Sequence, residues 1–248
     1  MPYEIIFKIF EYLTHDTLKG NIFKLNKLRS VCKFWYNVGD DPRLWHHLNI
    51  GQIAPAKFLL STSVLNSLEA RFKNENSVTE LKFQKFLTKF MKKTSLTTSC
   101  NQNKFKFITK LDLSFLCFLN CDMLKLILAN CDANNLKSLN LSFCKRIYLT
   151  NSDLVLGDII AEYCPKLNVL DMTGHDLRAV KTQQRYMNSI GDLLKIIGSN
   201  LIDFRMDKSL APLLSTLCVI IKNSKINYTV KIRLFLSWPP IMIFFTFF

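Results

Sequence analysis

Residues 136–144 read LKSLNLSFC, a short segment in which leucines alternate with polar residues before a serine, an aromatic residue and a cysteine. The segments ITKLDLSFL from residue 108 and LNVLDMTGH from residue 167 share this pattern. The three segments begin 28 and 31 residues apart. Alternation with a period of two predicts a β-strand in each copy. A repeat of this length is typical of stacked units that together bury one continuous core.

Two weaker segments extend the series on either side. LIDFRMDKS begins at residue 201 and VTELKFQKF begins at residue 78, and we interpret both as degenerate copies. The alignment superimposes one apolar position of each copy: Leu81, Leu111, Leu139, Leu170 and Phe204. We therefore expect four to five repeats within residues 78–210.

Helical segments separate the strand-like ones. CDMLKLILANC from residue 121, SDLVLGDIIAEYC from residue 152 and IGDLLKIIGSN from residue 190 each carry a leucine and isoleucine face. Each begins near an Asp or Ser that can cap exposed backbone N–H groups. A strand followed by a helix, repeated, predicts an α/β solenoid.

The residues that alternate with the repeat leucines form a mostly polar row. We expect this row on the concave face, where it suits a protein target better than an apolar ligand. The alternative is that several of its members are only solvated strand positions. The predicted row is Lys110, Asp112, Ser114, Ser138, Asn140, Ser142, Val169, Asp171, Thr173, Arg205 and Asp207.

The amino-terminal fifty residues predict a compact unit of short helices. PYEIIFKIFEYL, residues 2–13, has an apolar stripe at helical spacing behind a proline. A second apolar helical stretch contains Val31, Cys32 and Trp35 and stops at the turn-forming residues 39–42. A final apolar group follows at residues 44–48, and we expect His46 and His47 to be exposed helix residues.

These helical segments resemble a known family. PYEIIFKIFEYL, LRSVCKFW and DDPRLWHHL occur in the order of the F-box pattern, with a proline-led first helix, a Val-Cys-x-x-Trp centre and an Asp-Pro-x-Leu-Trp ending. LKSLNLSFC and the Cys-Pro-x-Leu turn at residues 164–167 resemble the cysteine-containing leucine-rich repeat that often follows an F-box. The resemblance implies a small α-helical F-box module followed by a short right-handed leucine-rich-repeat solenoid.

The resemblance also implies a function. The F-box would dock on the S-phase kinase-associated adaptor and, through it, on a cullin, while the repeats bind a target protein for ubiquitination by other subunits. The alternatives are a repeat scaffold that binds the adaptor without forming a ligase and a basic repeat protein that binds nucleic acid. The residues that match the F-box pattern, some of which must be core, are Pro2, Ile5, Ile6, Ile9, Leu13, Val31, Cys32, Trp35, Leu44 and Trp45.

The expected domains are an F-box at residues 1–50, a connector at 51–77, leucine-rich repeats at 78–210 and an irregular apolar end at 211–248. The last fifteen residues, LFLSWPPIMIFFTFF, carry no charge. As a helix they would span roughly 22 Å, which is short of the ~30 Å hydrocarbon core of a bilayer. We therefore expect no membrane partner, and the alternative is a short anchor.

Composition excludes several classes of protein. Only 7 glycines occur, and the chain has no glycine-rich phosphate-binding motif. The 4 histidines are scattered, and no cysteine stands beside a histidine as a nucleophile beside a base. We expect a non-catalytic protein without cofactor or metal, and with its 8 cysteines reduced in the cytoplasm or nucleus. The formal charge of +14 favours acidic partners, although we do not expect nucleic acid as the partner because the lysines are spread along the chain.

Overall fold

A computed structural model describes residues 2–15, 25, 27–50, 81–89, 107–116, 118–131, 133–144, 146–149, 155–175, 183–207, 230–235 and 242–247. The predicted connector at 51–77 lies outside the described residues. The helices, with the short 3₁₀ turns η1 and η4, are α1 (Tyr3–His15), α3 (Lys33–Gly39), η1 (Pro42–Trp45), α7 (Cys121–Asn130), η4 (Ala133–Asn135), α8 (Arg146–Leu149), α9 (Leu156–Tyr163) and α10 (Gln183–Ile197). The strands are β1 (His47–Asn49), β2 (Lys110–Asp112), β3 (Ser138–Asn140), β4 (Val169–Met172), β5 (Asp203–Asp207), β6 (Val230–Phe235) and β7 (Met242–Phe247).

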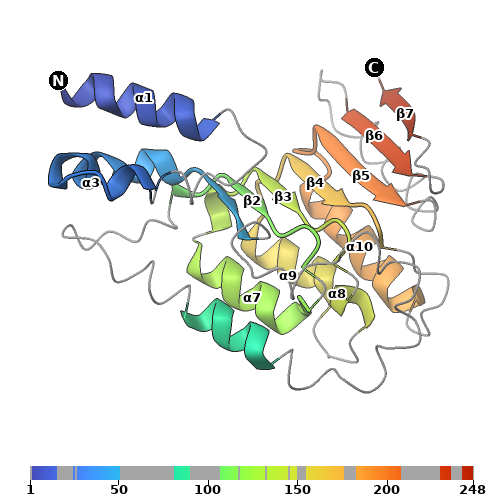
Figure 1. Ribbon diagram of the computed structural model, residues 1–248. Coiled ribbons are helices and arrows are strands. Elements are labelled where there is room, and N and C mark those ends of the chain that lie inside the picture. The colour runs from blue at the N-terminus through green and yellow to red at the C-terminus, as the bar shows by residue number, and fades with distance from the viewer. Residues whose placement is uncertain are drawn as a thin grey trace.

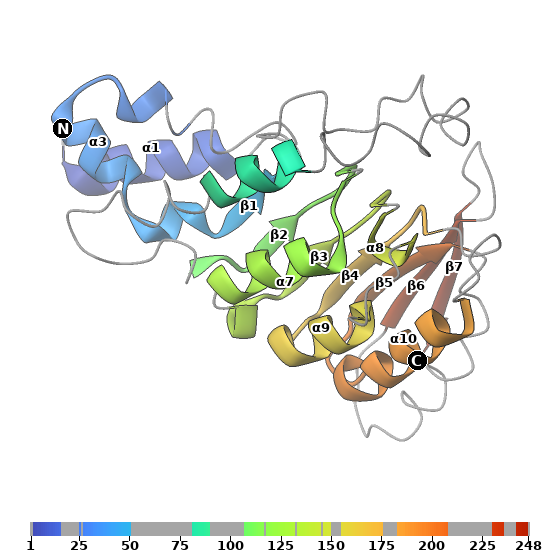
Figure 2. The same cartoon turned by 90° about the horizontal axis from the view of Figure 1, so that it is seen from below.

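The strands form one mixed sheet in which neighbours in sequence are neighbours in space. The order is β1 to β7, with parallel pairing from β1 through β6 and an antiparallel β7 at the edge. Helices α7, α9 and α10 connect consecutive parallel strands and lie together on one face of the sheet (Figures 1 and 2). The fold is therefore α/β, as the sequence predicted, with the amino-terminal helices α1 and α3 at the β1 end of the sheet.

The register of the strands matches the alignment of the repeats. Leu111 pairs with Leu139, Leu139 with Leu170, and Leu170 with Phe204. All four side chains are buried. Because alternate residues of a strand point to opposite faces, these residues face the helix layer, and the predicted alignment of the four positions is confirmed.

One expectation about the repeat region was wrong, and one predicted helix is longer than expected. Residues 81–89 form a helix instead of a fifth strand-like copy, because Phe83 and Leu87 recur at helical spacing and are buried while Leu81 is exposed. Helix α10 begins at Gln183, seven residues before the predicted segment. The early turns belong to the helix because Tyr186 and Met187 continue its buried face.

The ends of the sheet also differ from expectation. His47 lies in strand β1, which pairs in parallel with β2 and is too short to produce a sequence period. Residues 230–235 and 242–247, placed in an irregular end by the sequence analysis, form strands β6 and β7. The alternation of Val, Ile and Leu with Lys and Arg in VKIRLF is typical of a strand. No helix among the described residues is long and apolar enough to cross a membrane.

One hydrophobic core joins the amino-terminal helices to the sheet. The buried cluster runs without a break in contact from Ile6 and Phe10, through Trp45 and Leu48, to Phe204 in β5. Backbone bonds from Thr109 N and Lys110 N to His46 O, of 2.9 and 3.0 Å, continue this connection at the start of β2. The helical module and the sheet therefore share a core.

Candidate functional site

Helix α1 has two apolar faces. Ile6 and Phe10 are buried against the rest of the protein. Ile5 and Ile9, four residues apart, form a second stripe that is 48% and 37% exposed, and Tyr12 continues it. An amphipathic surface helix needs only one apolar face to pack on its own core, so the second stripe of α1 is available for another protein.

Helix α3 and the turn before it add further exposed apolar side chains. Val31 is 61% exposed, and Phe34 and Tyr36 are also exposed. The ring of Phe34 lies edge-on to that of Tyr3 in α1, with centroids 6.5 Å apart, so the two helices meet at this point. Figure 1 shows α1 and α3 side by side. We call the following set the docking patch: Ile5, Ile9, Tyr12, Leu13, Val31, Phe34 and Tyr36.

Asp41 links α1 to η1 at the end of the helical module. Its carboxylate accepts a 2.7 Å hydrogen bond from the Tyr3 hydroxyl, a 2.9 Å bond from Arg43 N, and bonds of 2.7 to 3.2 Å from the Arg43 guanidinium. Burial alone raises the pKa of Asp41, but the bonds from Arg43 and Tyr3 outweigh it and leave that pKa below its usual value. The Arg43 guanidinium also lies 4.2 Å from the centre of the Phe7 ring.

A second ion pair, between Arg29 and Asp40, lies at the carboxyl end of α3. Arg29 Nη2 lies 2.6 Å from Asp40 Oδ1, and the guanidinium stacks 4.4 Å from the centre of the Tyr36 ring. Gly39 lies against the stem of Arg29, where a Cβ atom would collide with the side chain. Trp45 Nε1 donates to the Gly39 carbonyl at 3.2 Å. The exposed Tyr36 ring of α3 is therefore packed on the Arg29–Asp40 ion pair.

The structure sorts the ten residues that match the F-box pattern. Pro2, Ile5, Ile9, Leu13, Val31 and Cys32 are exposed, whereas Ile6, Leu44 and Trp45 are core. Trp35 is half-buried, with its ring edge-on to Phe10 at 5.3 Å. Tyr12, Phe34 and Tyr36 were not predicted, although Tyr12 lies on the same helical stripe as Ile5 and Ile9. Their role in docking stays a prediction.

The second candidate surface is the strand face, which we define as the sheet face opposite α7, α9 and α10. Three of its predicted residues are capping groups. Asp112 Oδ1 accepts from Ser114 N at 2.9 Å, Asn140 Oδ1 from Ser142 N at 3.0 Å, and Asp171 Oδ1 from Thr173 N at 3.0 Å. Each such bond turns the chain at the end of a strand.

Because of these three turns, several residues of the predicted row are less exposed than expected. Ser114, Ser142 and Thr173 lie in turns after the strands, and Ser142, Asp171 and Thr173 are buried. Lys110 is exposed, Asp112, Ser138, Asn140, Val169 and Arg205 are half-buried, and the side chain of Asp207 lies outside the described residues. Target binding by this row stays a prediction.

Arg205 in β5 forms ion pairs with two aspartates. It lies 2.8 Å from Asp203 Oδ2 and 3.3 Å from Asp171 Oδ2, which belongs to the neighbouring strand. The hydrogen bond to Asp203 is the main cause of the raised pKa of Arg205. Its guanidinium is thus committed to two carboxylates of the protein itself.

Two stacked phenylalanine rings lie in the turns that follow β2 and β3. Phe115 and Phe143 occupy equivalent turns at φ of 63° and 60°, and Gly174 takes the next at 83°. The rings of Phe115 and Phe143 stack with centroids 4.9 Å apart and planes at 8°. A Cβ on Gly174 would meet Phe143 Cδ1 at 2.5 Å, so glycine ends the stack on that side.

The buried cysteines and histidine serve the core. Burial raises the pKa of the Cys131 and Cys164 thiols to about 12. Burial lowers the pKa of His175 to about 4, and its ring nitrogens bond to the Leu141 carbonyl at 2.9 Å and the Tyr186 hydroxyl at 2.8 Å. Among the described residues, no three His, Cys, Asp or Glu side chains stand close enough to hold a metal ion.

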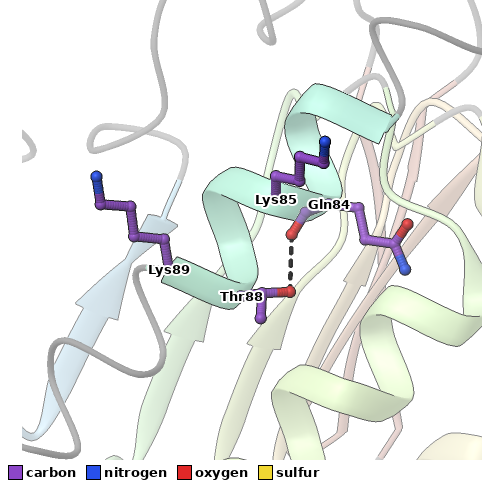
Figure 3. Close-up of a pocket in the computed structure, with 4 residues that line it drawn as sticks. All are labelled: Gln84, Lys85, Thr88 and Lys89. Atoms are coloured by element: carbon purple, nitrogen blue, oxygen red, sulfur yellow. Dashed lines mark hydrogen bonds between the residues drawn. The ribbon is translucent and has the colours of Figure 1, made fainter.

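A hollow of about 350 Å³ lies along helix 81–89. Gln84, Lys85, Thr88 and Lys89 line it, and the Thr88 hydroxyl donates to the Gln84 carbonyl at 2.9 Å. Figure 3 shows the two lysines and Gln84 pointing in different directions. These side chains do not converge on a ligand, and a catalytic site requires convergent groups.

The comparison with known families bears on the helical module. Residues 1–51 match the family model for F-box-like domains. These residues, which include the whole docking patch, thus form an F-box-like domain. A comparison with curated proteins found no match.

Proposed function

We propose that this protein is the substrate-recognition subunit of a cullin-based ubiquitin ligase. Its F-box-like domain docks on the S-phase kinase-associated adaptor, and its sheet region binds a target protein. The observation that carries the proposal is the docking patch, a set of exposed apolar side chains on α1, on α3 and on the turn before α3, within the residues that match the F-box-like family. Apolar patches on an otherwise charged surface mark protein interaction sites.

The sheet region supports the second half of the proposal. Consecutive parallel strands in register, each followed by a helix on the same face, are the arrangement of a leucine-rich-repeat solenoid. We propose that strands β2 to β5 and the helices between them are such repeats, degenerate in part, and that the strand face is their target-binding surface. The protein itself then supplies orientation and effective concentration, with the transfer of ubiquitin left to other subunits.

The test is capture of the adaptor and cullin by two variants with the same chemical change. In the first, Ile5→Ser and Ile9→Ser remove two exposed side chains of the docking patch. In the matched control, Ile196→Ser and Ile202→Ser remove two isoleucines that are 53% and 47% exposed on distant elements. We expect the first variant to lose at least about tenfold in adaptor affinity, since a buried isoleucine contributes about 1–3 kcal/mol to an interface.

The control variant should bind the adaptor as the natural protein does, and both variants should keep the natural far-ultraviolet circular dichroism spectrum. Undiminished adaptor capture by the Ile5/Ile9 variant would refute the docking surface. Capture of the adaptor without cullin would favour the scaffold, in which the F-box-like domain does not build a ligase.

A further inference from the structure

The strand face carries two rows of side chains across β2, β3 and β4, and all but Val169 have hydrogen-bonding groups. Lys110, Ser138 and Val169 are paired in register across the three strands. Asp112, Asn140 and Asp171 form the next row along the strands. Because neighbouring strands are ~4.8 Å apart, the two rows cover a surface roughly 10 Å wide.

The carboxylates of this surface are already engaged within the protein. Asp112 accepts one bond from Ser114 N and another, at 3.1 Å, from Asn49 Nδ2. Asp171 accepts from Thr173 N with one oxygen and from Arg205 with the other. The negative charge of Asp171 is thus offset by a cation of the protein, and each carboxylate oxygen of Asp112 and Asp171 has a hydrogen-bond donor.

The groups left over on this surface are donors. Lys110 is exposed and has no ion-pair partner among the described residues. The Ser138 hydroxyl has no hydrogen-bond partner in the described part of the chain. Asn140 uses its carbonyl oxygen to accept from Ser142 N, and its Nδ2 amide group has no acceptor within the same described residues. Within the described part of the chain, one ammonium, one hydroxyl and one amide are therefore available to a ligand.

We propose that this part of the strand face binds an acidic peptide segment of the target, in which unmodified Asp or Glu side chains accept from Lys110, Ser138 and Asn140. This inference rests on the proposed function, since it names the chemistry of the target that the repeats hold. A carboxylate matches a surface with spare donors and engaged acceptors. The net charge of +14 attracts the same partner over longer range. An extended peptide of roughly three or four residues spans the 10 Å surface.

The experiment measures binding of fluorescein-labelled peptides to the full chain by fluorescence anisotropy. The probe is Gly-Glu-Glu-Glu-Glu-Gly, and the comparison peptides replace every Glu with Gln or with phosphoserine. The protein variants are Lys110→Met and, as the matched control, Lys89→Met, which removes an equal charge from an exposed lysine of helix 81–89. Adaptor capture is measured on the same preparations.

We expect the Glu peptide to bind at least about tenfold more tightly than the Gln peptide. Lys110→Met should weaken binding of the Glu peptide about fivefold, as expected for one partly exposed charge-assisted bond, and Lys89→Met should change it less than about twofold. An equal loss in both lysine variants would overturn the proposal, because the peptide would then sense only the overall charge. Tighter binding of the phosphoserine peptide would overturn it in favour of a modified target.

Failure of this inference can be told apart from failure of the proposed function. A protein that captures adaptor and cullin but does not bind the Glu peptide refutes the acidic segment and leaves the ligase subunit standing. A protein that captures neither adaptor nor cullin refutes the proposed function, whatever the peptide does.

Discussion

At the scale of single residues, the same chemical group serves different purposes according to its contacts. Ile5 and Ile6 are identical neighbours, yet one is exposed on the docking patch and the other is core. Asp112 and Asp171 occupy equivalent strand positions, but only Asp171 also pairs with Arg205. The function of each residue therefore follows from its partners.

His175 provides a test of one such residue. Its folded-state pKa of about 4 lies below the ordinary 6.5, so the folded protein disfavours the protonated ring. Protonation of this group therefore does not change the free energy of unfolding above pH 6.5. Below that pH the free energy of unfolding falls as the pH drops toward 4, by up to about 1.4 kcal/mol per pH unit. The measurement is chemical unfolding of the natural protein and His175→Gln at pH 7.5, 6.0 and 5.0.

Because glutamine does not titrate, the stability advantage of the natural protein over His175→Gln should shrink as the pH falls. A difference in unfolding free energy that stays constant over this range would contradict the assigned role of the buried ring. Such a result would mean that His175 reaches water or a compensating acid in the folded protein.

At the scale of elements, close packing between helices depends on small residues. Helices α9 and α10 approach each other at Gly157. A Cβ atom added at this position would collide with the Ser189 carbonyl and hydroxyl. The Ser189 hydroxyl donates to Asp158 Oδ1 at 3.3 Å across the same interface. A larger residue at position 157 must therefore push the two helices apart.

We predict that Gly157→Ala destabilises the protein. The gain in helix propensity is at most about 1 kcal/mol, whereas overpacking against a backbone carbonyl that cannot rotate away costs about 1–3 kcal/mol. The control is Ser189→Ala, which removes the hydroxyl without adding volume and should cost less. The free energy of unfolding in urea decides between them, and a Gly157→Ala protein more stable than the natural one would show that α9 and α10 are not in close contact.

At the scale of the whole molecule, the helical module and the sheet share one core. Buried contacts run from α1 through β1 into the remaining strands, so damage in the sheet should reach the module. Leu139 in β3 is fully buried, and Leu139→Ala should cost about 2–5 kcal/mol through the cavity that it leaves. Leu139 lies two strands from β1, outside the helical module that contains Trp35 and Trp45.

The prediction is that Leu139→Ala lowers the unfolding midpoint of the module together with that of the sheet. In a Trp238→Phe background, tryptophan fluorescence reports only Trp35 and Trp45, while circular dichroism reports the whole chain. Coincident shifts of both signals indicate one cooperative unit. A fluorescence transition that stays at its original midpoint would mean that the module folds independently.

The sequence by itself determined the elements that have a strong local period. Helix α1 was predicted from its apolar stripe, and strands β2, β3 and β4 with their alignment were predicted from alternating leucines. Local periods are readable because each residue's burial follows from its place on one helix or strand. Short or weakly periodic elements were missed: β1 has three residues, and helix 81–89 was mistaken for a strand.

Only the tertiary structure decided which residues are free to bind a partner. Nothing in the sequence near Asp171 shows that Arg205, 34 residues later, engages its carboxylate, or that Asn49 does the same for Asp112 across 63 residues. The sorting of Ile5 from Ile6 likewise depends on where Phe10, Val38 and Trp45 meet. Long-range contacts form when the whole chain is packed, and no sequence window contains both partners. For that reason the sequence named the candidate surfaces, and the packing selected the side chains available on them.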